Sequence, residues 1–346
     1  MITEFQARIA EGKPLRIRGG GSKDGYGNAL EGDVLDTRGH AGIVAYEPTE
    51  LFITAKCGTP LAEIEAALAA SGQCLPFEPP RFSADSTIGG VVAAGLSGPR
   101  RVSAGALRDF VLGVKLLDGE ARELAFGGQV MKNVAGYDVS RVMAGSLGTL
   151  GLITEVSLKV LPRPVADATL RFAMTQAEAL DTLNRWAARP LPIVASAWEA
   201  GVLTLRLAGA RAAVETAQQN IGAGEMEESA VWDALRDQTA AFFQTEILWR
   251  LSVPSTAPEL NLPGKQLIEW GGALRWLKSD APAETIRATA AAVGGSATLY
   301  RAPAELKAQV GAFAPLPAPL MALHQNLKAA FDPRGLFNPG RFYRGL

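Results

Sequence analysis

Three consecutive glycines followed by a serine, at Gly19–Ser22, constrain this chain more than any other feature of its sequence. They follow the short apolar segment Leu15–Arg18, which predicts a strand that runs into a tight turn. Glycine accepts positive φ angles and has no side chain, so such a turn can present a nest of N–H groups to an anion. A second glycine segment, Ser86–Gly90, also lies beside an apolar run. Together the two segments predict a diphosphate held from two sides.

The spacing of these glycines disfavours two common nucleotide-binding motifs. It is not G-x-G-x-x-G, and no acidic residue closes a second strand about 20 residues further on, as a Rossmann nicotinamide site requires. The pattern G-x-x-x-x-G-K-[ST] of P-loop nucleotidases is also absent. From these residues alone, a flexible turn between two strands remains an alternative reading of Gly19–Gly21.

Composition narrows the class of protein. The chain has 346 residues, which is enough for about two domains. Its 34 Lys and Arg residues balance 35 Asp and Glu residues, so there is no net field to attract nucleic acid or an anionic membrane. The first residues contain acids and lack an apolar core, and no long apolar run follows, so we expect neither a signal peptide nor a membrane span.

Cysteine and histidine are scarce. Cys57 and Cys74 do not form a C-x-x-C motif, so the chain cannot hold a conventional iron–sulfur cluster alone, and we expect two buried, unpaired thiols. His40 and His324 are far apart in the sequence, which predicts no metal site. His40 follows a polar loop and is expected at the surface. His324 lies in a helical pattern, and a functional role for it stays open.

Strand-like and helix-like segments alternate without the regular order of a βαβ series, which predicts an α+β fold. Pro162 and Pro164 interrupt the chain after Val160, and the composition then changes. The main strands expected before this break are Leu15–Arg18, Asp33–Asp36, Ile43–Glu47, Phe52–Lys56, Phe110–Leu117, Ala121–Phe126 and Leu152–Val160. A helix is expected over Thr59–Ser71, with Thr59 at its N-cap. After the break we expect a sheet covered on one face by helices, with strands at Ala168–Ala173, Ile193–Trp198, Leu203–Leu207, Ile247–Val253 and Gly272–Trp276. The helices are expected at Gln176–Ala188, Ala210–Ile221, Ala230–Phe243 and Ala283–Ala292.

Several segments, in this order, resemble the flavoproteins of the vanillyl-alcohol-oxidase (VAO) or PCMH type. The matching segments are Arg18–Ser22, Ser86–Gly90, Ser97–Arg100, Gly105–Gly113, Lys132–Asp138, Gly145–Glu155 and Phe331–Gly340. Each motif is weak by itself, but their shared order from residue 18 to 340 is specific. More narrowly, Gly127–Arg141 followed by a short variable region resembles the FAD-binding E-subunit family of bacterial glycolate oxidases.

This resemblance implies a PCMH-type, VAO-like FAD-binding domain with a small α+β cap domain. The FAD-binding domain would span residues 1–161 together with the tail 325–346, and the cap would span 162–324. Relatives with covalently bound FAD carry a histidine where this chain has Ser22 or Lys23, so the FAD should be noncovalent. The cofactor-binding residues implied are Gly19, Gly20, Gly21, Ser22, Lys23, Asp24, Pro79, Ser86, Thr87, Gly89, Gly90, Gly95, Gly98, Gly105, Leu107, Gly151, Ile153 and Asn338.

Some of these residues carry more specific expectations from the resemblance. Gly98, Gly105 and Leu107 would line the path to the isoalloxazine. Ile153 would present backbone groups to the adenine end, and Asn338 would approach the flavin ring. A tight strand connection without a ligand remains the alternative for Gly145–Gly151.

The resemblance also implies a function within a complex. The chain would be the FAD-binding subunit of a multi-subunit glycolate, or 2-hydroxy acid, oxidase or dehydrogenase, with a larger FAD-containing subunit and an iron–sulfur subunit as partners. Relatives that oxidise 2-hydroxy acids carry a late motif rich in histidine and acids, and this chain lacks it. We expect it in the cytoplasm, at most peripheral at the inner membrane through its partners. The alternatives are a self-sufficient FAD-dependent 2-hydroxy acid dehydrogenase and a non-catalytic structural subunit.

Two tryptophan-containing segments of the expected cap are of interest, Trp249–Pro254 and Trp270–Leu277. Alternation places Trp249, Leu251 and Val253 on one face of a strand and Arg250 on the other. A core face with a solvated face is one interpretation. The other assigns Arg250 and Arg275 as catalytic candidates that bind a substrate carboxylate. Because Trp and Arg are enriched at binding hot spots, these segments are also a candidate docking surface.

Overall fold

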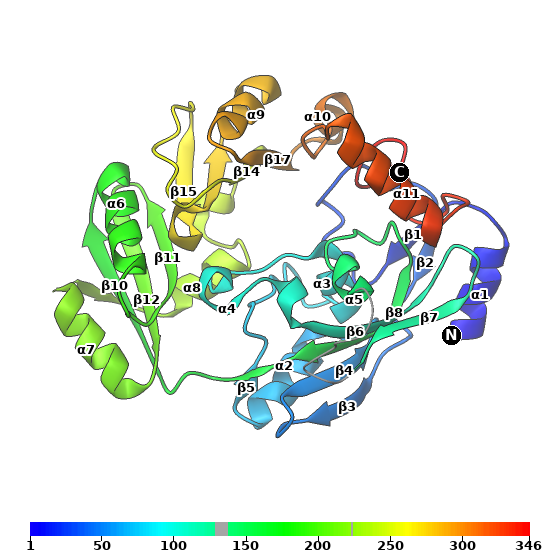
Figure 1. The fold of residues 1–346 in the computed structure, drawn as a ribbon, viewed down its shortest axis with the longest axis horizontal. Coiled ribbons are helices and arrows are strands. Elements are labelled where there is room, and N and C mark those ends of the chain that lie inside the picture. The colour runs from blue at the N-terminus through cyan, green and yellow to red at the C-terminus, as the bar shows by residue number, and fades with distance from the viewer. Residues whose placement is uncertain (129–137, 223) are drawn as a thin grey trace. The chain divides into compact units, whose positions relative to one another are not determined.

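The computed structural model describes residues 1–128, 138–222 and 224–346, and the chain divides into two compact units (Figure 1). The first unit comprises Met1–Leu96, Ala106–Pro162 and Pro315–Leu346. The second comprises Ser97–Gly105 and Arg163–Ala314. The sequence had placed residues 97–105 in the FAD-binding domain and residues 315–324 in the cap. In the structure, 97–105 belongs to the second unit and 315–324 to the first. All of the motif at Lys132–Asp138 except Asp138 lies outside the described residues.

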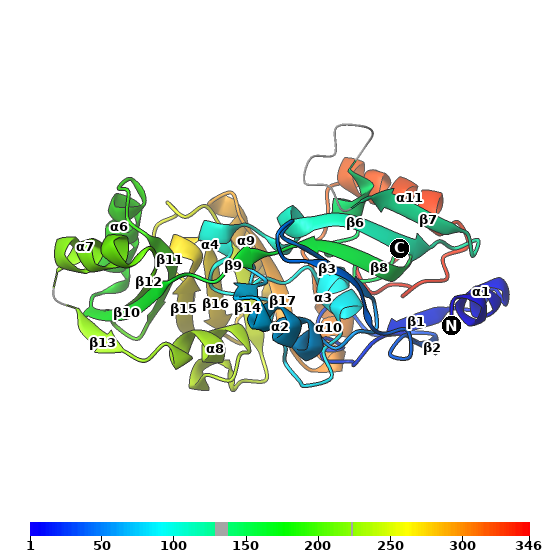
Figure 2. The ribbon, with the colours of Figure 1, turned by 90° about the horizontal axis from the view of Figure 1, so that it is seen from below.

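The first unit is built around a five-stranded antiparallel sheet (Figure 2). Its strand order is β3 (Ile43–Glu47), β4 (Phe52–Lys56), β8 (Leu152–Lys159), β6 (Val111–Leu117) and β7 (Glu123–Gly127). The central strand β8 is buried on both faces along most of its length, which is why its sequence reads as a nearly continuous apolar run. The shorter elements of this unit are β5 (Gln73–Cys74), β9 (Leu161–Pro162), η1 (Leu107–Phe110) and α5 (Val139–Val142).

A second layer of the first unit joins the two ends of the chain. Helix α1 (Ile2–Ala10) precedes strand β1 (Leu15–Arg18), which pairs in parallel with β2 (Asp33–Asp36). Helix α11 (Ala318–Phe331) leads to a segment that forms a bridge with β1 between Phe337 and Leu15. The core here contains Phe5, Ile9, Leu15, Leu35, Leu117, Leu152, Leu336 and Phe337. The aromatic tail is therefore packed against the N-terminal strand.

Two helices of the first unit differ from the sequence expectation. Helix α2 (Leu61–Ala70) starts at Leu61, because the Thr59 hydroxyl bonds to Gly42 and Lys56 and does not cap the helix. Helix α3 (Ile88–Ala94) begins inside the Ser86–Gly90 segment, which was expected to be a loop. The two glycines of that segment are therefore helical, and the apolar residues that follow continue a buried helix.

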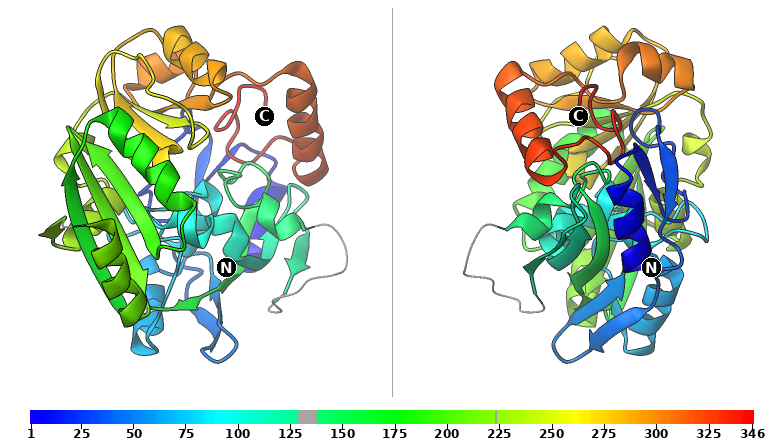
Figure 3. Two further views of the ribbon diagram at one scale, coloured as in Figure 1. Left: turned by 60° about the vertical axis from the view of Figure 1, so that its left-hand side comes forward. Right: turned by 90° about the vertical axis from the view of Figure 1, so that its right-hand side faces the viewer.

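The second unit contains an eight-stranded antiparallel sheet. Its order is β13 (Glu225–Glu227), β10 (Ala166–Ala173), β12 (Val202–Gly209), β11 (Ile193–Glu199), β15 (Lys265–Glu269), β16 (Leu274–Lys278), β14 (Leu248–Ser252) and β17 (Ser296–Arg301). Helices α6 (Gln176–Ala187) and α7 (Arg211–Ile221) pack on one face of this sheet and share a core with β12 (Figure 3, left). The remaining elements are α4 (Arg101–Ala104), α8 (Ala230–Arg236), η2 (Ala241–Phe243), η3 (Trp270–Gly272), α9 (Ala283–Ala292) and α10 (Ala304–Val310).

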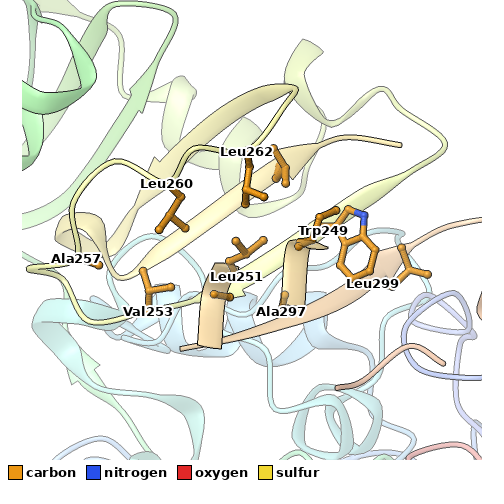
Figure 4. Close-up of a cluster of buried hydrophobic side chains, with 11 residues drawn as sticks. Trp249, Leu251, Val253, Ala257, Leu260, Leu262, Ala297 and Leu299 are labelled. Atoms are coloured by element: carbon orange, nitrogen blue, oxygen red, sulfur yellow. The ribbon is translucent and has the colours of Figure 1, made fainter. Parts of the chain in front are cut away.

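A second core of this unit lies between α9 and the strands β14, β16 and β17 (Figure 4). The predicted alternation on β14 is confirmed, since Trp249, Leu251 and Val253 all point into this core. The docking surface expected from the tryptophans is wrong. Trp249, Trp270 and Trp276 are at most 5% exposed and pack inside the unit itself.

Candidate functional site

Alternate backbone N–H groups of strand β1 donate hydrogen bonds to the C-terminal tail. The N–H of Leu15 donates to Leu336 O at 2.7 Å, and the N–H of Ile17 donates to the side-chain oxygen of Asn338 at 2.8 Å. Beyond Ile17 the N–H groups of the glycine loop have no partner in the tail. Among the described residues, none accepts a hydrogen bond from the amides of Gly19, Gly20, Gly21 or Ser22. The loop therefore offers a run of N–H donors suited to an anion.

Buried and half-buried charges fix the far end of this glycine loop. Asp24 accepts hydrogen bonds from Arg16 at 2.7 Å and from Arg18 at 2.9 Å. Arg341, which is 5% exposed, donates to the backbone oxygens of Lys23 at 3.0 Å and of Asp24 at 2.9 Å. Burial lowers the pKa of Arg341 to about 10, so it still carries its charge near neutral pH. The loop is thus held in shape before any ligand binds.

Lys23 connects the two glycine segments. Its Nζ donates to Ser86 Oγ at 2.9 Å and to Ser22 Oγ at 3.2 Å, and it lies over the Phe82 ring. Lys23 therefore adds positive charge at the point where the two segments meet. This contact was not expected from either motif alone.

The glycines in the two segments serve different purposes. A Cβ atom at Gly20 would lie 1.6 Å from Asp85 O, one at Gly19 would lie 2.1 Å from Thr87 Oγ1, and one at Gly89 would lie 2.7 Å from Cys57 Cβ. These three glycines are required by close packing within the protein. At Gly90 the nearest atom to an added Cβ is Thr87 Oγ1 at 3.5 Å, and the Gly90 amide has no acceptor in the described part of the chain. The Gly90 site is therefore open.

Asn338 fastens the turn that precedes β8. Its side-chain nitrogen donates to Leu147 O at 2.7 Å, while its side-chain oxygen accepts from Ile17. Its φ of 42° is in the left-handed region, which asparagine tolerates better than most residues. A Cβ at Gly148 would lie 2.7 Å from the Asn338 amide nitrogen, so the turn also needs glycine there. Both polar atoms of the side chain are used, which makes Asn338 a support for the site.

Lys328 anchors the same turn from helix α11. Its buried Nζ donates to Thr149 O at 2.6 Å, to Asp332 Oδ2 at 2.7 Å and to Phe337 O at 3.0 Å. Burial lowers its pKa, whereas Asp332 acts in the opposite direction. The pair therefore ties the tail to the loop before β8.

One cavity of the first unit brings together most of the predicted cofactor residues. It is lined by Gly19, Gly20, Gly21, Ser22, Lys23, Asp24, Thr87, Gly89, Gly90, Gly151, Ile153 and Asn338. Ser86 contributes through its bond to Lys23. Pro79, Gly95 and Leu107 belong to the first unit but do not line the cavity, and Gly98 and Gly105 belong to the second unit.

Further lining residues were not predicted. They are Ile17, Arg18, Leu30, Thr37, Cys57, Ala93, Ala94, Leu147, Gly148, Leu152 and Arg341. Most are apolar or lie outside any recognisable motif. Arg18, Leu147, Gly148 and Leu152 lie within the matching segments Arg18–Ser22 and Gly145–Glu155, and Arg341 directly follows the N-P-G turn of the tail.

Comparison with known proteins identifies the family. The FAD binding domain family matches residues 6–127. The glycolate oxidase subunit GlcE of Escherichia coli K12 is 48% identical over 347 aligned residues, which cover 100% of this chain and 97% of that protein. This chain belongs to the GlcE family. An alignment of this length and identity covers both units, and the predicted family is confirmed.

Other similarities of this GlcE-family chain are more limited. The glycolate oxidase subunit GlcD of Bacillus subtilis is 33% identical over 128 residues, which is 37% of this chain and 27% of that protein. A solved alkyldihydroxyacetonephosphate synthase has a TM-score of 0.67 at 15% identity, over 98% of this chain and 74% of its own. That likeness shows the fold, and it confirms the predicted α+β, PCMH-type class.

The cysteines and His40 of this GlcE-family chain are buried or half-buried. Cys57 is buried, Cys74 is half-buried, and neither forms a disulfide. Burial raises the pKa of the Cys57 thiol to about 12. His40 is half-buried against Phe5, not exposed as expected, and burial lowers its pKa. Within the described residues no group of three or more His, Cys, Asp or Glu side chains is arranged to hold a metal ion.

The two catalytic candidates lie in the second unit and differ in environment. Arg275 is fully buried and donates to the backbone oxygens of Gly272, Pro258 and Ala257. Burial lowers its pKa. Its guanidinium thus holds a loop together and is not presented to a ligand. Arg250 is half-buried, and the interaction found for it in the described structure is with the Trp270 ring at 5.2 Å.

Proposed function

We propose that this chain is the FAD-binding subunit of a multi-subunit glycolate oxidase or dehydrogenase, and that the first unit binds FAD noncovalently while the second acts as a small cap. The observation that carries this proposal is the set of amides at Gly19–Ser22 and Gly90 that have no acceptor within the described residues. Full-length similarity to GlcE supplies the chemical context.

The chain's own residues fit the cofactor. The free amides of the glycine loop and of Gly90 would bind the diphosphate, and Lys23 would add positive charge beside it. Ile153 and Gly151 would flank the adenine end. Ser22 and Lys23 stand where covalent relatives have histidine, so no covalent bond to the flavin forms. Bound FAD would supply two-electron redox chemistry.

The substrate chemistry is proposed to depend on partners. Oxidation of a 2-hydroxy acid needs a general base, and histidine is the side chain that most often takes this role. This chain has two histidines. His40 packs against Phe5, and His324 packs against Phe342 and Tyr343. A larger FAD-containing subunit, of the kind named GlcD, would therefore hold glycolate, and an iron–sulfur subunit would accept the electrons. The assembly would work in the cytoplasm or, through its partners, at the inner membrane surface.

Within the described residues, no helix is both long and apolar enough to cross a bilayer.

Dye reduction with glycolate tests the dependence on partners. The purified chain should reduce the dye close to background, because general-base assistance commonly contributes about 10²–10⁴ in rate. Co-expression with the larger flavin subunit and the iron–sulfur subunit should restore turnover. Equal turnover by the isolated chain would instead show a self-sufficient dehydrogenase.

A further inference from the structure

The turn before β8 contributes residues to two cavities of the first unit. Leu147 and Gly148 line the candidate cofactor cavity. Ser146, Thr149 and Leu150 line a second cavity of about 240 Å³, which has no described lining residue in common with the first. Helices α5 and α11 and the C-terminal tail supply its other walls. The second cavity is therefore a separate space, which the proposed cofactor site does not explain.

Most of the walls of this second cavity are apolar. They are formed by Val142, Ala144, Leu150, Leu327, Phe342 and Leu346. A cavity of about 150 Å³ is large enough for benzene, and pockets for drug-sized ligands start at about 300 Å³. The second cavity therefore matches a small molecule with an apolar body about the size of a single ring.

The charge at this cavity is already balanced. Lys328 is the one Lys, Arg, Asp or Glu among the described lining residues, and its ammonium group donates to Asp332 Oδ2, Thr149 O and Phe337 O. These three hydrogen bonds use all three N–H groups of the lysine, and the Asp332 carboxylate balances its charge. A charged ligand would lose its hydration here without gaining an opposite charge. The cavity therefore favours a neutral molecule.

Two polar groups of the lining keep unused hydrogen-bonding capacity. His324 Nδ1 lies 2.8 Å from Leu320 O, and because a carbonyl oxygen only accepts, Nδ1 carries the hydrogen and Nε2 of the neutral ring is an acceptor. Among the described residues, none donates to this Nε2. Ser146 is 6% exposed, and its hydroxyl accepts from the Gly148 N–H at 3.4 Å but donates to no group in the described parts of the chain.

We propose that the second cavity is a binding site for a small neutral alcohol. A hydroxyl group can accept from Ser146 and can donate to His324 Nε2, and an apolar body would fill the space beside Leu150 and Leu327. This proposal goes beyond the proposed function and does not depend on it, because the site has no described residue in common with the candidate cofactor cavity.

Ligand-observed NMR titration of the full-length chain, with and without FAD, tests this site. The probes share one ring: cyclohexanol donates and accepts, cyclohexanone only accepts, and cyclohexanecarboxylate is an anion. Cyclohexanol should bind most tightly. His324→Leu should reduce the preference for cyclohexanol over cyclohexanone by about 2- to 10-fold, because one hydrogen bond is lost. Gln325→Leu is the matched control, since Gln325 is exposed on the same helix and does not line the cavity.

Two further variants locate the ligand. Ser146→Ala should weaken both cyclohexanol and cyclohexanone about 2- to 10-fold and leave the preference between them unchanged, because both probes can accept from this hydroxyl. Val142→Trp should abolish binding of both, since Val142 lines the cavity while 41% exposed, so that an indole can fill the cavity from its exposed side. Leu323→Trp is the control, because Leu323 is 62% exposed on α11 and does not line the cavity.

The outcomes separate this proposal from the proposed function. Absence of saturable cyclohexanol binding, or an unchanged preference in His324→Leu, overturns the site. Tighter binding of cyclohexanecarboxylate than of cyclohexanol overturns the ligand class. Displacement of cyclohexanol by FAD places the ligand in the cofactor cavity and also overturns the site. Flavin content is read from absorbance in the same samples, and a chain that binds cyclohexanol but takes up no FAD contradicts the proposed function alone.

Discussion

Gly90 is the residue at which cofactor binding and protein folding can be separated. Outside its own helix backbone, a Cβ atom added there has Thr87 Oγ1 at 3.5 Å as its nearest neighbour, yet a side chain would project into the proposed diphosphate site. We predict that Gly90→Val abolishes flavin binding and changes the melting temperature by no more than a few degrees. Flavin absorbance per chain and thermal unfolding measure the two effects. Gly128→Val is the matched control, because that glycine also has open space and does not line the cavity.

Gly20 gives the opposite expectation. A valine there would clash with the backbone oxygen of Asp85, so Gly20→Val should lower stability whether or not FAD is present. A Gly20→Val chain that keeps its melting temperature but loses flavin would contradict this packing role. The triple glycine motif therefore combines a structural requirement with a ligand requirement.

Cys57 is predicted to be unreactive although it lines the cavity. Its pKa rises from 9.0 to about 12 because it is buried. At pH 8 only about 10⁻⁴ of the thiol is then ionised, and the thiolate is the nucleophile. Iodoacetamide at pH 8 should modify Cys74 well before Cys57 in the apo and FAD-loaded chains, as measured by peptide mass spectrometry. Equal labelling rates would show that Cys57 is not buried in solution.

At the scale of elements, the tail is predicted to stabilise β1 and the turn before β8 together. Asn338→Ala would leave the Ile17 amide and the Leu147 carbonyl without partners and would place alanine at a positive φ. Each orphaned group costs about 1–3 kcal/mol, so the free energy of unfolding should fall by about 2–5 kcal/mol. Urea denaturation measures this loss, with the exposed Asn261→Ala as control. A loss below about 0.5 kcal/mol would show that the tail contact is dispensable.

Local sequence patterns predicted many elements well. The strands Leu15–Arg18, Asp33–Asp36, Ile43–Glu47 and Phe52–Lys56 have the expected bounds. Others depended on tertiary context. The strands Lys265–Glu269 and Ser296–Arg301 were missed. Lys265–Glu269 has no clear alternation of polar and apolar residues, and both strands are fixed by pairing in a large sheet. The helix expected over Ala230–Phe243 ends at Arg236, and Gln238 adopts a φ of 55°.

The site was predictable where glycine was the signal. The two glycine segments could be found from sequence because close approach excludes side chains. The contacts made by Arg341 and Lys328 could not be found from the sequence, since these side chains reach the site only after the tail returns to β1. Arg275 could not be distinguished from Arg250 by sequence. Burial and three carbonyl partners separate them only in the folded chain.

At the scale of the whole molecule, the candidate cofactor site is made by segments from both ends of the first unit's sequence. The glycine loop, helix α3, the turn before β8 and the tail all line one cavity. The second unit contains both arginines that were catalytic candidates, Arg250 and Arg275, but Arg275 binds backbone oxygens of that unit and so has a structural role. This division agrees with a subunit whose main task is to hold FAD.

The central claim, noncovalent FAD in this chain, is tested most directly by one absorbance spectrum taken before and after acid precipitation. We predict a flavin spectrum in the purified chain and all of the flavin in the supernatant after precipitation. A flavin that remains with the precipitated protein would contradict noncovalent binding. A colourless chain that takes up no added FAD would contradict the cofactor assignment itself.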